Sequence, residues 1–270
     1  MSSLITLITD FGSADTYVGV LKGVILSINP SCNIVDITHQ IPPQDISEAA
    51  FALMTAYAYF PPGTIHLVIV DPGVGSTRRP LLIEAENYFF IGPDNGVFSA
   101  ILRKPGLKSV IELTNTEYFL ADVSSTFHGR DIFAPVAAHL SQGRACSQFG
   151  APISDWVLFD WPQPTMVTAG EAQGVILHID RFGNLITNFS RDFIKQALGN
   201  RPFKIECADA VIRQVIPSYS HAEPGELCGV FGSSNYLEIS VTRGSARDRL
   251  NARCGDMVKV TEVELDKNIA

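Results

Sequence analysis

The sequence predicts an α/β protein, with an N-terminal α/β sandwich-type domain followed by a smaller, all-β, barrel-like C-terminal domain. In the first part of the chain, short apolar runs alternate with stretches whose apolar residues recur at helical spacing. Further along, short β-type runs are separated by Gly, Asn and Pro, which is typical of a small barrel or sandwich. A Trp-Pro-Gln-Pro stretch lies between the two patterns. We therefore expect domains at 1–160 and 173–270, joined by a linker at 161–172.

The first elements alternate strand and helix. Leu4–Thr9 is an apolar run that ends in a turn signal, and Asn33–Thr38 predicts a second strand. Between them, residues 15–28 carry apolar side chains at the spacing of one helix face. The residues at 45–48, Asp-Ile-Ser-Glu, resemble a capping box and open an Ala-rich helix. This helix is expected to end at the Pro-Pro-Gly sequence of 61–63.

The rest of the first domain continues the alternation. Ile65–Val70 has no polar alternation after its histidine, which predicts a strand buried on both faces. Leu81–Ala85 and Tyr88–Ile91 are expected to form a hairpin, and Val110–Leu113 a further strand. Arg130–Leu140 has the pattern of a helix.

The second domain is expected to consist of strands. They are Gly174–Asp180, Leu185–Phe189, Phe203–Cys207, Val211–Ile216, Leu227–Phe231, Tyr236–Val241 and Met257–Val263.

Composition excludes several classes of protein. Of the 270 residues, 46% are hydrophobic and 18% charged, which is enough apolar material for a core and excludes a disordered chain. Lys and Arg number 20 against 28 Asp and Glu, a net charge of −8. Such an acidic chain is a poor candidate for binding nucleic acid or an anionic membrane through bulk charge.

Cysteine usage and hydropathy indicate a cytoplasmic protein. The five cysteines are scattered and never form a CxxC pair, so neither a disulfide framework nor a zinc ribbon fits. The N-terminus lacks the basic region of a signal peptide, and no window approaches 18 uncharged apolar residues. We expect a reducing compartment and no contact with a membrane.

Polar residues follow three of the predicted strands. Asp10, Asp71 and Asp94 with Asn95 each come at a strand end, beside glycines that allow a ligand to approach the backbone. Asp and Gly also follow strands because they form turns and cap helices, so each position alone has a structural explanation. Taken together, the three strand ends favour a small-molecule site and a purely structural role equally.

A carboxylate, a guanidinium and an imidazole are candidates for water activation. Asp71 is followed by Arg78, and His128 comes later; together these groups could position a water and stabilise hydroxide. The alternative is a core or capping histidine and a solvated arginine. The sequence has no GxxxxGK[ST], no strand–GxGxxG–helix, no HExxH and no GxSxG motif.

Several ordered motifs in both halves resemble a known family. They are Thr9-Asp10-Phe11-Gly12, Tyr17-Val18-Gly19, Asp36-Ile37-Thr38-His39, Val70-Asp71-Pro72-Gly73-Val74-Gly75 with Arg78-Arg79, Gly92-Pro93-Asp94-Asn95-Gly96, Thr126-Phe127-His128-Gly129-Arg130-Asp131 and Asp180-Arg181-Phe182-Gly183-Asn184. Together they resemble the S-adenosylmethionine hydrolases (adenosine-forming), also called SAM hydroxide adenosyltransferases, which are relatives of the fluorinating and chlorinating enzymes. The resemblance covers nearly the whole chain.

The resemblance implies an activity, an assembly and a set of site residues. The activity is hydrolysis of S-adenosylmethionine to adenosine and methionine, with no metal and no cofactor besides this substrate. The assembly is a homotrimer whose ligand lies between the N-terminal domain of one subunit and the C-terminal domain of the next. The implied catalytic residues are Asp71, Arg78 and His128. The implied substrate-binding residues are Asp10, Asp15, Tyr17, Thr126, Phe127, Asp180, Asn184, Ser233 and Ala246.

The residues agree with this chemistry. A sulfonium leaves as a neutral thioether, so displacement at the ribose C5′ needs no general acid but does need a strong, aligned nucleophile. Two alternatives stay open: a SAM-dependent halide adenosyltransferase, and a non-catalytic protein that binds SAM or adenosine. The halogenating relatives replace the Asp and His of the triad. Because Asp71 and His128 are both present, hydrolysis is favoured over halide transfer.

Overall fold

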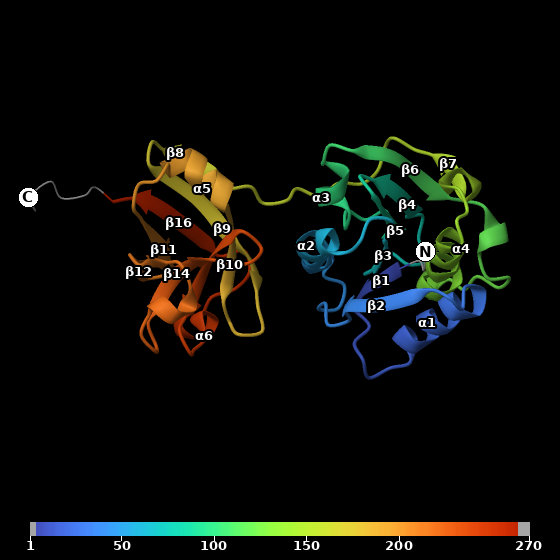
Figure 1. Cartoon of the computed structure of the whole chain (residues 1–270), viewed down its shortest axis with the longest axis horizontal. Coiled ribbons are helices and arrows are strands. Elements are labelled where there is room, and N and C mark those ends of the chain that lie inside the picture. The colour runs from blue at the N-terminus through green and yellow to red at the C-terminus, as the bar shows by residue number, and fades with distance from the viewer. Residues whose placement is uncertain (1–3, 264–270) are drawn as a thin grey trace, which may run out of the picture. The chain divides into compact units, whose positions relative to one another are not determined.

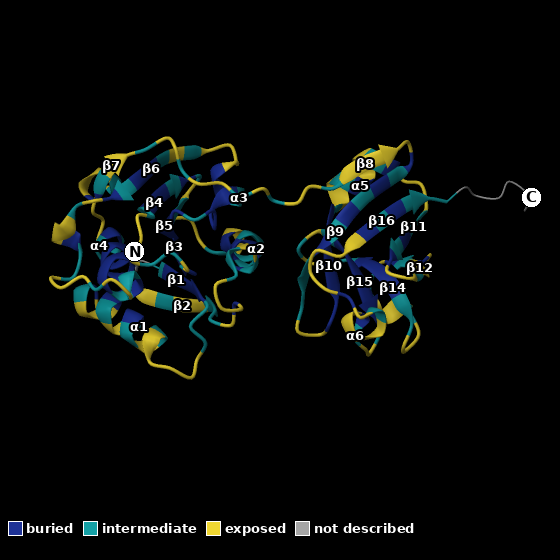
Figure 2. Ribbon diagram, turned by 180° about the vertical axis from the view of Figure 1, so that it is seen from behind, coloured by how far each residue is buried: buried dark blue, intermediate teal, exposed yellow. Residues whose placement is uncertain are grey.

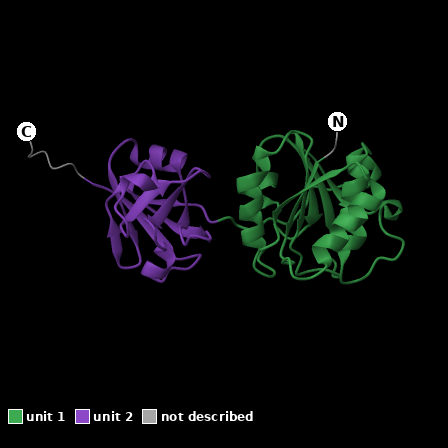
Figure 3. Cartoon of the chain, turned by 60° about the horizontal axis from the view of Figure 1, so that its bottom comes forward, with its two compact units in different colours: residues 1–161 green, residues 162–270 purple. Residues whose placement is uncertain are grey.

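The computed structural model describes residues 4–263, and the chain divides into two compact units between Trp161 and Pro162 (Figure 3). The linker expected at 161–172 is too long. Strand β8 (Thr165–Thr168) lies inside that range and pairs with β9 (Glu171–Ile179) of the second unit. The prolines that suggested a linker do not prevent pairing, because Thr165 already follows the last of them.

The first unit is built on a seven-stranded sheet with the order β2-β1-β3-β5-β4-β6-β7 (Figure 1). Its strands are β1 (Leu4–Thr9), β2 (Asn33–Thr38), β3 (Ile65–Ile69), β4 (Pro80–Ala85), β5 (Tyr88–Pro93), β6 (Leu107–Leu113) and β7 (Gly150–Pro152). Strands β2, β1, β3 and β5 pair in parallel, and β4 joins β5 as the expected antiparallel hairpin. The carboxyl ends of the parallel strands therefore lie at one edge of the sheet.

Helices cover both faces of this sheet and make an α/β sandwich. They are α1 (Tyr17–Ile28), α2 (Ile46–Ala56), α3 (Ser99–Leu102) and α4 (Ala134–Ser141). Alternate residues of β1 point to opposite faces. Leu7 belongs to the core beneath α1 and α4, whereas Ile8 belongs to the core beneath α2 and α3. In Figure 2 the strands are mostly buried, while α1 exposes its outer face.

Local sequence signals explain where these helices begin. The side chain of Asp45 accepts a hydrogen bond from the Glu48 N–H at 2.9 Å, the first half of the expected capping box.

Strand β3 is buried along its whole length, as its lack of polar alternation after His66 predicted. The helix expected at Arg130–Leu140 is a π-helix, Gly129–Phe133, followed by α4.

The second unit is a nine-stranded, nearly closed barrel. Its order is β12-β11-β16-β9-β10-β15-β14-β13, with β8 beside β9. The remaining elements are β10 (Leu185–Ser190), α5 (Arg191–Leu198), β11 (Phe203–Cys207), β12 (Ala210–Ile212), β13 (Val215–Ile216), β14 (Leu227–Phe231), β15 (Tyr236–Val241), α6 (Ala246–Leu250) and β16 (Met257–Glu262).

Two expectations for this unit are wrong. The strand expected at Val211–Ile216 is divided into β12 and β13, which pair with different neighbours, β11 and β14. Helix α5 was not expected. It begins at a Ser190 cap, whose side chain accepts from the Phe193 N–H, and it buries Ile194 and Leu198. These two apolar residues are four apart and face the core together.

The described residues show two further properties of the chain. None of the five cysteines forms a disulfide. None of the helices in the region 4–263 combines the length and apolarity needed to cross a bilayer.

His66 is a fully buried histidine in the core of the first unit. Its Nδ1 lies 2.8 Å from the Thr6 hydroxyl, and its ring stacks on Phe90 at 5.2 Å between centroids. Burial lowers the pKa of His66 to about 4 from 6.5. The unfolded chain therefore takes up a proton that the folded chain resists, and we expect stability to fall by up to about 3 kcal/mol as the pH drops from about 6.5 to about 4.

Urea unfolding measured across this pH range tests the expectation. His66→Leu should flatten the dependence of the unfolding free energy on pH, because the variant has no imidazole to protonate on unfolding. His221→Leu is the matched control, since His221 lies exposed in the second unit. An unchanged slope in His66→Leu would contradict the assignment.

Candidate active site

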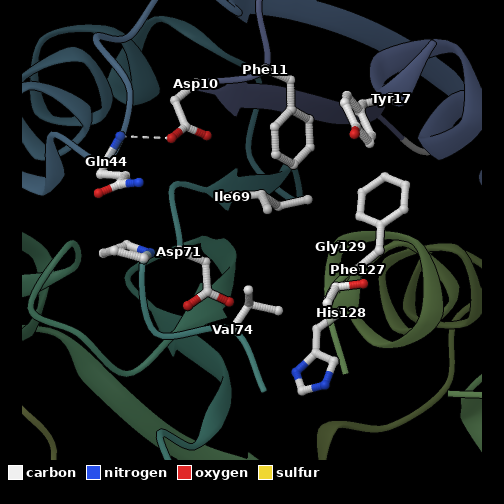
Figure 4. A pocket seen from close by; sticks show the side chains of 12 residues that line it. Asp10, Phe11, Tyr17, Gln44, Ile69, Asp71, Val74, Phe127, His128 and Gly129 are labelled. Atoms are coloured by element: carbon white, nitrogen blue, oxygen red, sulfur yellow. Dashed lines mark hydrogen bonds between the residues drawn. The ribbon is translucent and has the colours of Figure 1, made fainter. Parts of the chain in front are cut away.

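A cavity of about 410 Å³ lies at the carboxyl ends of β1 and β3 (Figure 4). It is lined by Asp10, Phe11, Tyr17, Gln44, Ile69, Asp71, Pro72, Val74, Thr126, Phe127, His128 and Gly129. Most of these residues lie at or just after the ends of β1, β2 and β3, where ligands of open α/β sheets bind, and Thr126 to Gly129 come from the segment after β6.

Strand register brings the two carboxylates to one edge. Strands β1 and β3 pair in parallel with Thr9 opposite Ile69. Asp10 follows its strand by one residue and Asp71 follows Ile69 by two, so both side chains reach the same cavity. The structure thus places Asp10 and Asp71 in the lining of one cavity. Asp94 differs, because its buried carboxylate accepts from Arg79 at 2.7 Å and from the Val157 N–H at 2.8 Å.

The loop that carries Asp10 is fixed by its neighbours. The Gln44 N–H donates to Asp10 Oδ2 at 2.8 Å (Figure 4), and Gln44 adopts a φ of +68°. A side chain other than glycine occupies this left-handed region at a cost. Behind the loop, the His39 ring contacts the Thr9 hydroxyl at 2.9 Å, and the His39 carbonyl accepts from the Gly12 N–H at 2.8 Å.

Asp71, Arg78 and His128 form one hydrogen-bonded cluster. Arg78 Nε donates to Asp71 Oδ1 at 2.8 Å and Arg78 Nη2 donates to Asp71 Oδ2, so the pair is bidentate. The same Nη2 lies 2.8 Å from His128 Nδ1. The side chains of Asp71 and Arg78 are only 6% and 8% exposed, which strengthens their interaction by excluding water.

The hydrogen bonds define the protonation state of His128. A guanidinium can only donate, so Nδ1 of His128 is an acceptor and the neutral ring carries its proton on Nε2. Burial and then the Arg78 charge lower the pKa of His128 below 6.5, although Asp71, Asp131 and a Ser124 backbone hydrogen bond raise it. His128 is consequently neutral near pH 7.

Three aromatic rings form one wall of the cavity. Phe11, Tyr17 and Phe127 lie with their ring centroids between 5.2 and 5.8 Å apart. The Tyr17 side chain is 47% exposed although it contacts both neighbours. An apolar surface of this kind suits the flat face of a nucleobase or a thioether.

The second unit has a cavity of its own, of about 800 Å³. It is lined by Asp180, Phe182, Asn184, Pro217, Ser218, Tyr219, Val230, Phe231, Gly232, Ser233, Glu238, Val241, Thr242, Arg243 and Gly244. Asp180 organises the turn beside it, since its Oδ1 accepts the N–H groups of Phe182 and Asn184, both at 2.9 Å. Burial raises the pKa of Glu238, whose carboxylate accepts from the Tyr219 hydroxyl at 2.7 Å.

The structure brings most of the predicted site residues to these two cavities. Asp10, Tyr17, Asp71, Thr126, Phe127 and His128 line the first, and Asp180, Asn184 and Ser233 line the second. Arg78 lies directly behind the first cavity on Asp71. Within the described residues, Asp15 and Ala246 line neither. Asp15 is exposed beyond the Phe11 turn, and Ala246 is wholly buried in the barrel core.

Sequence reasoning missed Gln44, Tyr219 and Glu238. The Pro-Pro-Gln-Asp sequence has no glycine or asparagine to signal a left-handed residue at Gln44. Glu238 is the one charged residue of the mostly apolar strand β15, and this was the available signal, because a carboxylate inside the strand must find a partner. In the described part of the chain, no group of three or more His, Cys, Asp or Glu residues is placed to hold a metal ion.

Fold and site define a two-domain α/β protein with a charged, aromatic-walled site for a small molecule. The SAM hydroxide adenosyltransferase N-terminal domain profile matches residues 5–150, and the C-terminal domain profile of the same family matches residues 174–259. The chain belongs to the SAM hydroxide adenosyltransferase family.

Individual relatives agree with this assignment. The chain is 36% identical to an (R)-S-adenosyl-L-methionine hydrolase of Salinispora tropica, covering 95% of this chain and 97% of that one. It is 34% identical to an (R)-S-adenosyl-L-methionine hydrolase of Methanocaldococcus jannaschii, covering 95% of each. A fluorinase of Actinoplanes sp. is more distant, at 28% identity over 96% of this chain and 97% of that one.

A solved structure also matches over nearly the full length. The crystal structure of an uncharacterized conserved protein from Thermotoga maritima superposes with a TM-score of 0.89 at 34% identity. It covers 96% of this chain, and this chain covers all of it. The likeness supports both the α/β sandwich and the barrel.

Proposed function

We propose that the protein hydrolyses S-adenosyl-L-methionine to adenosine and L-methionine by attack of an activated water on the ribose C5′. The observation that carries this is the cluster of Asp71, Arg78 and His128, which places a buried guanidinium and two cavity-lining groups within reach of one water. The relatives named as (R)-S-adenosyl-L-methionine hydrolases support the choice of substrate.

We infer a role for each member of the triad from its hydrogen bonds. In the reaction the water oxygen bonds to C5′, the C5′–S bond breaks toward sulfur, and the water loses a proton. Asp71 is the group that accepts this proton, because Arg78 only donates and the single lone pair of His128 Nδ1 is engaged, whereas each Asp71 oxygen keeps a second lone pair besides the one that accepts from Arg78. The buried Arg78 charge stabilises the developing hydroxide, and His128 holds the guanidinium through Nη2, the nitrogen that also donates to Asp71.

The remaining side chains hold the substrate. The Asp10 carboxylate accepts from the ribose diol, since two hydroxyl donors match its two oxygens. Tyr17, Thr126 and Phe127 line the nucleoside. In the second unit, Asp180, Asn184 and Ser233 contact the methionine and adenine ends.

We further propose a cytoplasmic homotrimer, in which each ligand is held by the N-terminal domain of one subunit and the C-terminal domain of the next. The family resemblance supports this assembly, and separate cavities in the two units are consistent with a ligand that needs both. Light scattering with a parallel activity assay tests it. Full activity in a verified monomer would contradict the assembly.

Product analysis in ¹⁸O-water tests the reaction. Purified protein is incubated with S-adenosylmethionine in chloride-free buffer, and the products are resolved by chromatography and mass spectrometry. Adenosine with ¹⁸O on C5′ is the expected product. A 5′-halo nucleoside formed only on adding chloride would instead establish halide transfer, and thermal protection by the ligand without adenosine would establish a binding protein.

Gln44 is expected to matter through its backbone. Gln44→Pro removes the N–H that holds Asp10 and fixes φ near −65°, which is incompatible with the observed +68°. We expect adenosine affinity to fall by about tenfold or more, because a charge-assisted hydrogen bond to the ribose-binding carboxylate is lost. Isothermal titration with adenosine measures the effect.

Gln44→Gly is the matched control for this prediction. Glycine keeps the N–H and adopts positive φ without strain, so affinity should stay within about threefold of the original. If Gln44→Gly weakened binding as much as Gln44→Pro, the side chain rather than the backbone would be the important group.

A further inference from the structure

The Arg130-Asp131 pair lies two residues after His128 in the chain, and neither residue takes part in the proposed reaction. Asp131 is fully buried, yet it is a carboxylate. Arg130 Nε donates to its Oδ1 at 2.6 Å and Arg130 Nη2 to its Oδ2 at 3.1 Å. Burial alone would raise the pKa of Asp131, but the hydrogen bonds from Arg130 and Ser124 outweigh it and hold the pKa below its usual range.

Asp131 connects to three points of the loop at 120–128, which carries part of the cavity wall. At its start, the Leu120 N–H donates to the Asp131 carbonyl at 2.9 Å. In the middle, the Ser124 N–H and hydroxyl both donate to Asp131 Oδ2 at 2.8 Å. At its end, the Asp131 N–H donates to the Phe127 carbonyl at 3.1 Å.

The loop has little else to order it. Most of residues 121–126 are exposed and none forms a regular element, so few apolar contacts oppose its motion. Ser124 connects Asp131 to Phe127, since its hydroxyl donates to Asp131 and accepts from the Phe127 N–H at 3.1 Å. The Arg130 guanidinium lies over the Phe127 ring at 5.3 Å from its centroid.

The π-helix explains why this arrangement exists. Gly129–Phe133 makes the wider turn, with the Ala134 N–H donating to the Gly129 carbonyl, five residues earlier. Such turns are rare and occur often at functional sites. Gly129 packs closely, because a Cβ there would lie 3.2 Å from the Phe127 ring and 3.3 Å from Ile69. The turn therefore sets His128 and Asp131 on one short, tightly packed segment.

We propose that Asp131 is a positioning residue, which orders the 120–128 loop so that Thr126, Phe127 and His128 enter the active cavity. The Asp131 charge also raises the pKa of His128. The other groups that act on this ring are Arg78, which lowers the pKa, and Asp71 and Ser124, which raise it. This inference rests on the proposed function for its kinetic readout, and has a structural readout that does not.

The central test compares Asp131→Asn with Asp122→Asn. Asp122 is an exposed carboxylate of the same loop, so its variant removes an equal charge from the same segment. We expect kcat/KM for S-adenosylmethionine to fall by about 100-fold in Asp131→Asn, the cost of a misplaced catalytic group, and to stay within about twofold in Asp122→Asn. Because Asp131 and Ser124 both raise the pKa of His128, the acid limb of kcat/KM should move to lower pH.

Two further measurements keep the proposal falsifiable. Amide hydrogen exchange in a peptide spanning 120–128 should be faster in Asp131→Asn than in Asp122→Asn, whether or not the protein hydrolyses S-adenosylmethionine. Should Asp131→Asn fail to fold, Ser124→Ala is the alternative variant. It keeps the Arg130–Asp131 pair but removes the hydroxyl that accepts from the Phe127 N–H, and we expect kcat/KM for S-adenosylmethionine to fall by about tenfold. Unchanged exchange, kcat/KM and acid limb in the folded variants would overturn the proposal.

Discussion

His128→Ala is expected to lower turnover of S-adenosylmethionine by about 1,000-fold while leaving its affinity within about tenfold. The physical reason is that His128 contacts Arg78 Nη2 at 2.8 Å and lines the cavity, but it is not the group that holds the ribose. Asp71→Asn should behave alike, because an amide cannot take the proton that leaves the water. Single-turnover kinetics and equilibrium binding, measured separately, check both variants.

A second histidine supplies the control. His139 lies in α4, packed on Tyr118 at 5.2 Å between ring centroids, and lines neither cavity among the described residues. His139→Ala should retain turnover within about threefold of the original once the fraction of folded protein is matched. If His128→Ala and Asp71→Asn lost affinity as much as turnover, these residues would hold the ligand rather than form the nucleophile.

Arg78→Met should lower turnover by at least about 100-fold and also shift the pH dependence. The Arg78 charge lowers the pKa of His128 in addition to burial, so its removal raises that pKa. Activity that requires neutral His128 is lost as the pH falls through this pKa, and the acid limb therefore moves to higher pH. Arg78→Lys keeps the charge but not the bidentate fork, so turnover should fall with a much smaller shift of the limb.

Arg103→Met is the control for the loss of one positive charge. Arg103 contacts the exposed Asp160 at 3.5 Å on the surface of the same unit, and its replacement should leave both turnover and the acid limb unchanged. Stability must be followed in parallel, because Arg78→Met leaves the buried Asp71 carboxylate without its partner. An acid limb that stays in place in Arg78→Met would show that His128 does not set it.

Much of the fold follows from local pattern. Strands β1, β2 and β3 were predicted because apolar runs of strand length ended in turn residues, and α2 because Asp45 was followed by Glu48. Helix α5 was missed, although Ser190, Ile194 and Leu198 provide a cap and one apolar face. Its polar composition gave no apolar run to notice. The π-helix has no local signature, since an extra residue in a turn depends on what the turn packs against.

Site residues could be predicted from the sequence where the proposed chemistry requires a particular side chain. They could not be predicted where the contribution comes from the backbone, as at Gln44. His128 follows Arg78 by 50 residues, and Asp71 comes seven residues before Arg78, so only their ordered motifs indicated that the three meet. Gln44 acts through its N–H and its positive φ, which any residue type could in principle supply. Asp15 follows Asp10 by only five residues, yet it is exposed and lines neither cavity.

The parallel pairing of β1 with β3 relates the position of Asp10 to that of Asp71. Thr9 lies opposite Ile69, so the pairing sets the two strand ends that precede Asp10, the proposed ribose-binding residue, and Asp71, the proposed proton acceptor. The residues proposed to activate the nucleophile, at 71, 78 and 128, all lie outside this pairing. On the proposed function, substitutions at these three positions would change the nucleophile without altering the strand pairing that precedes Asp10.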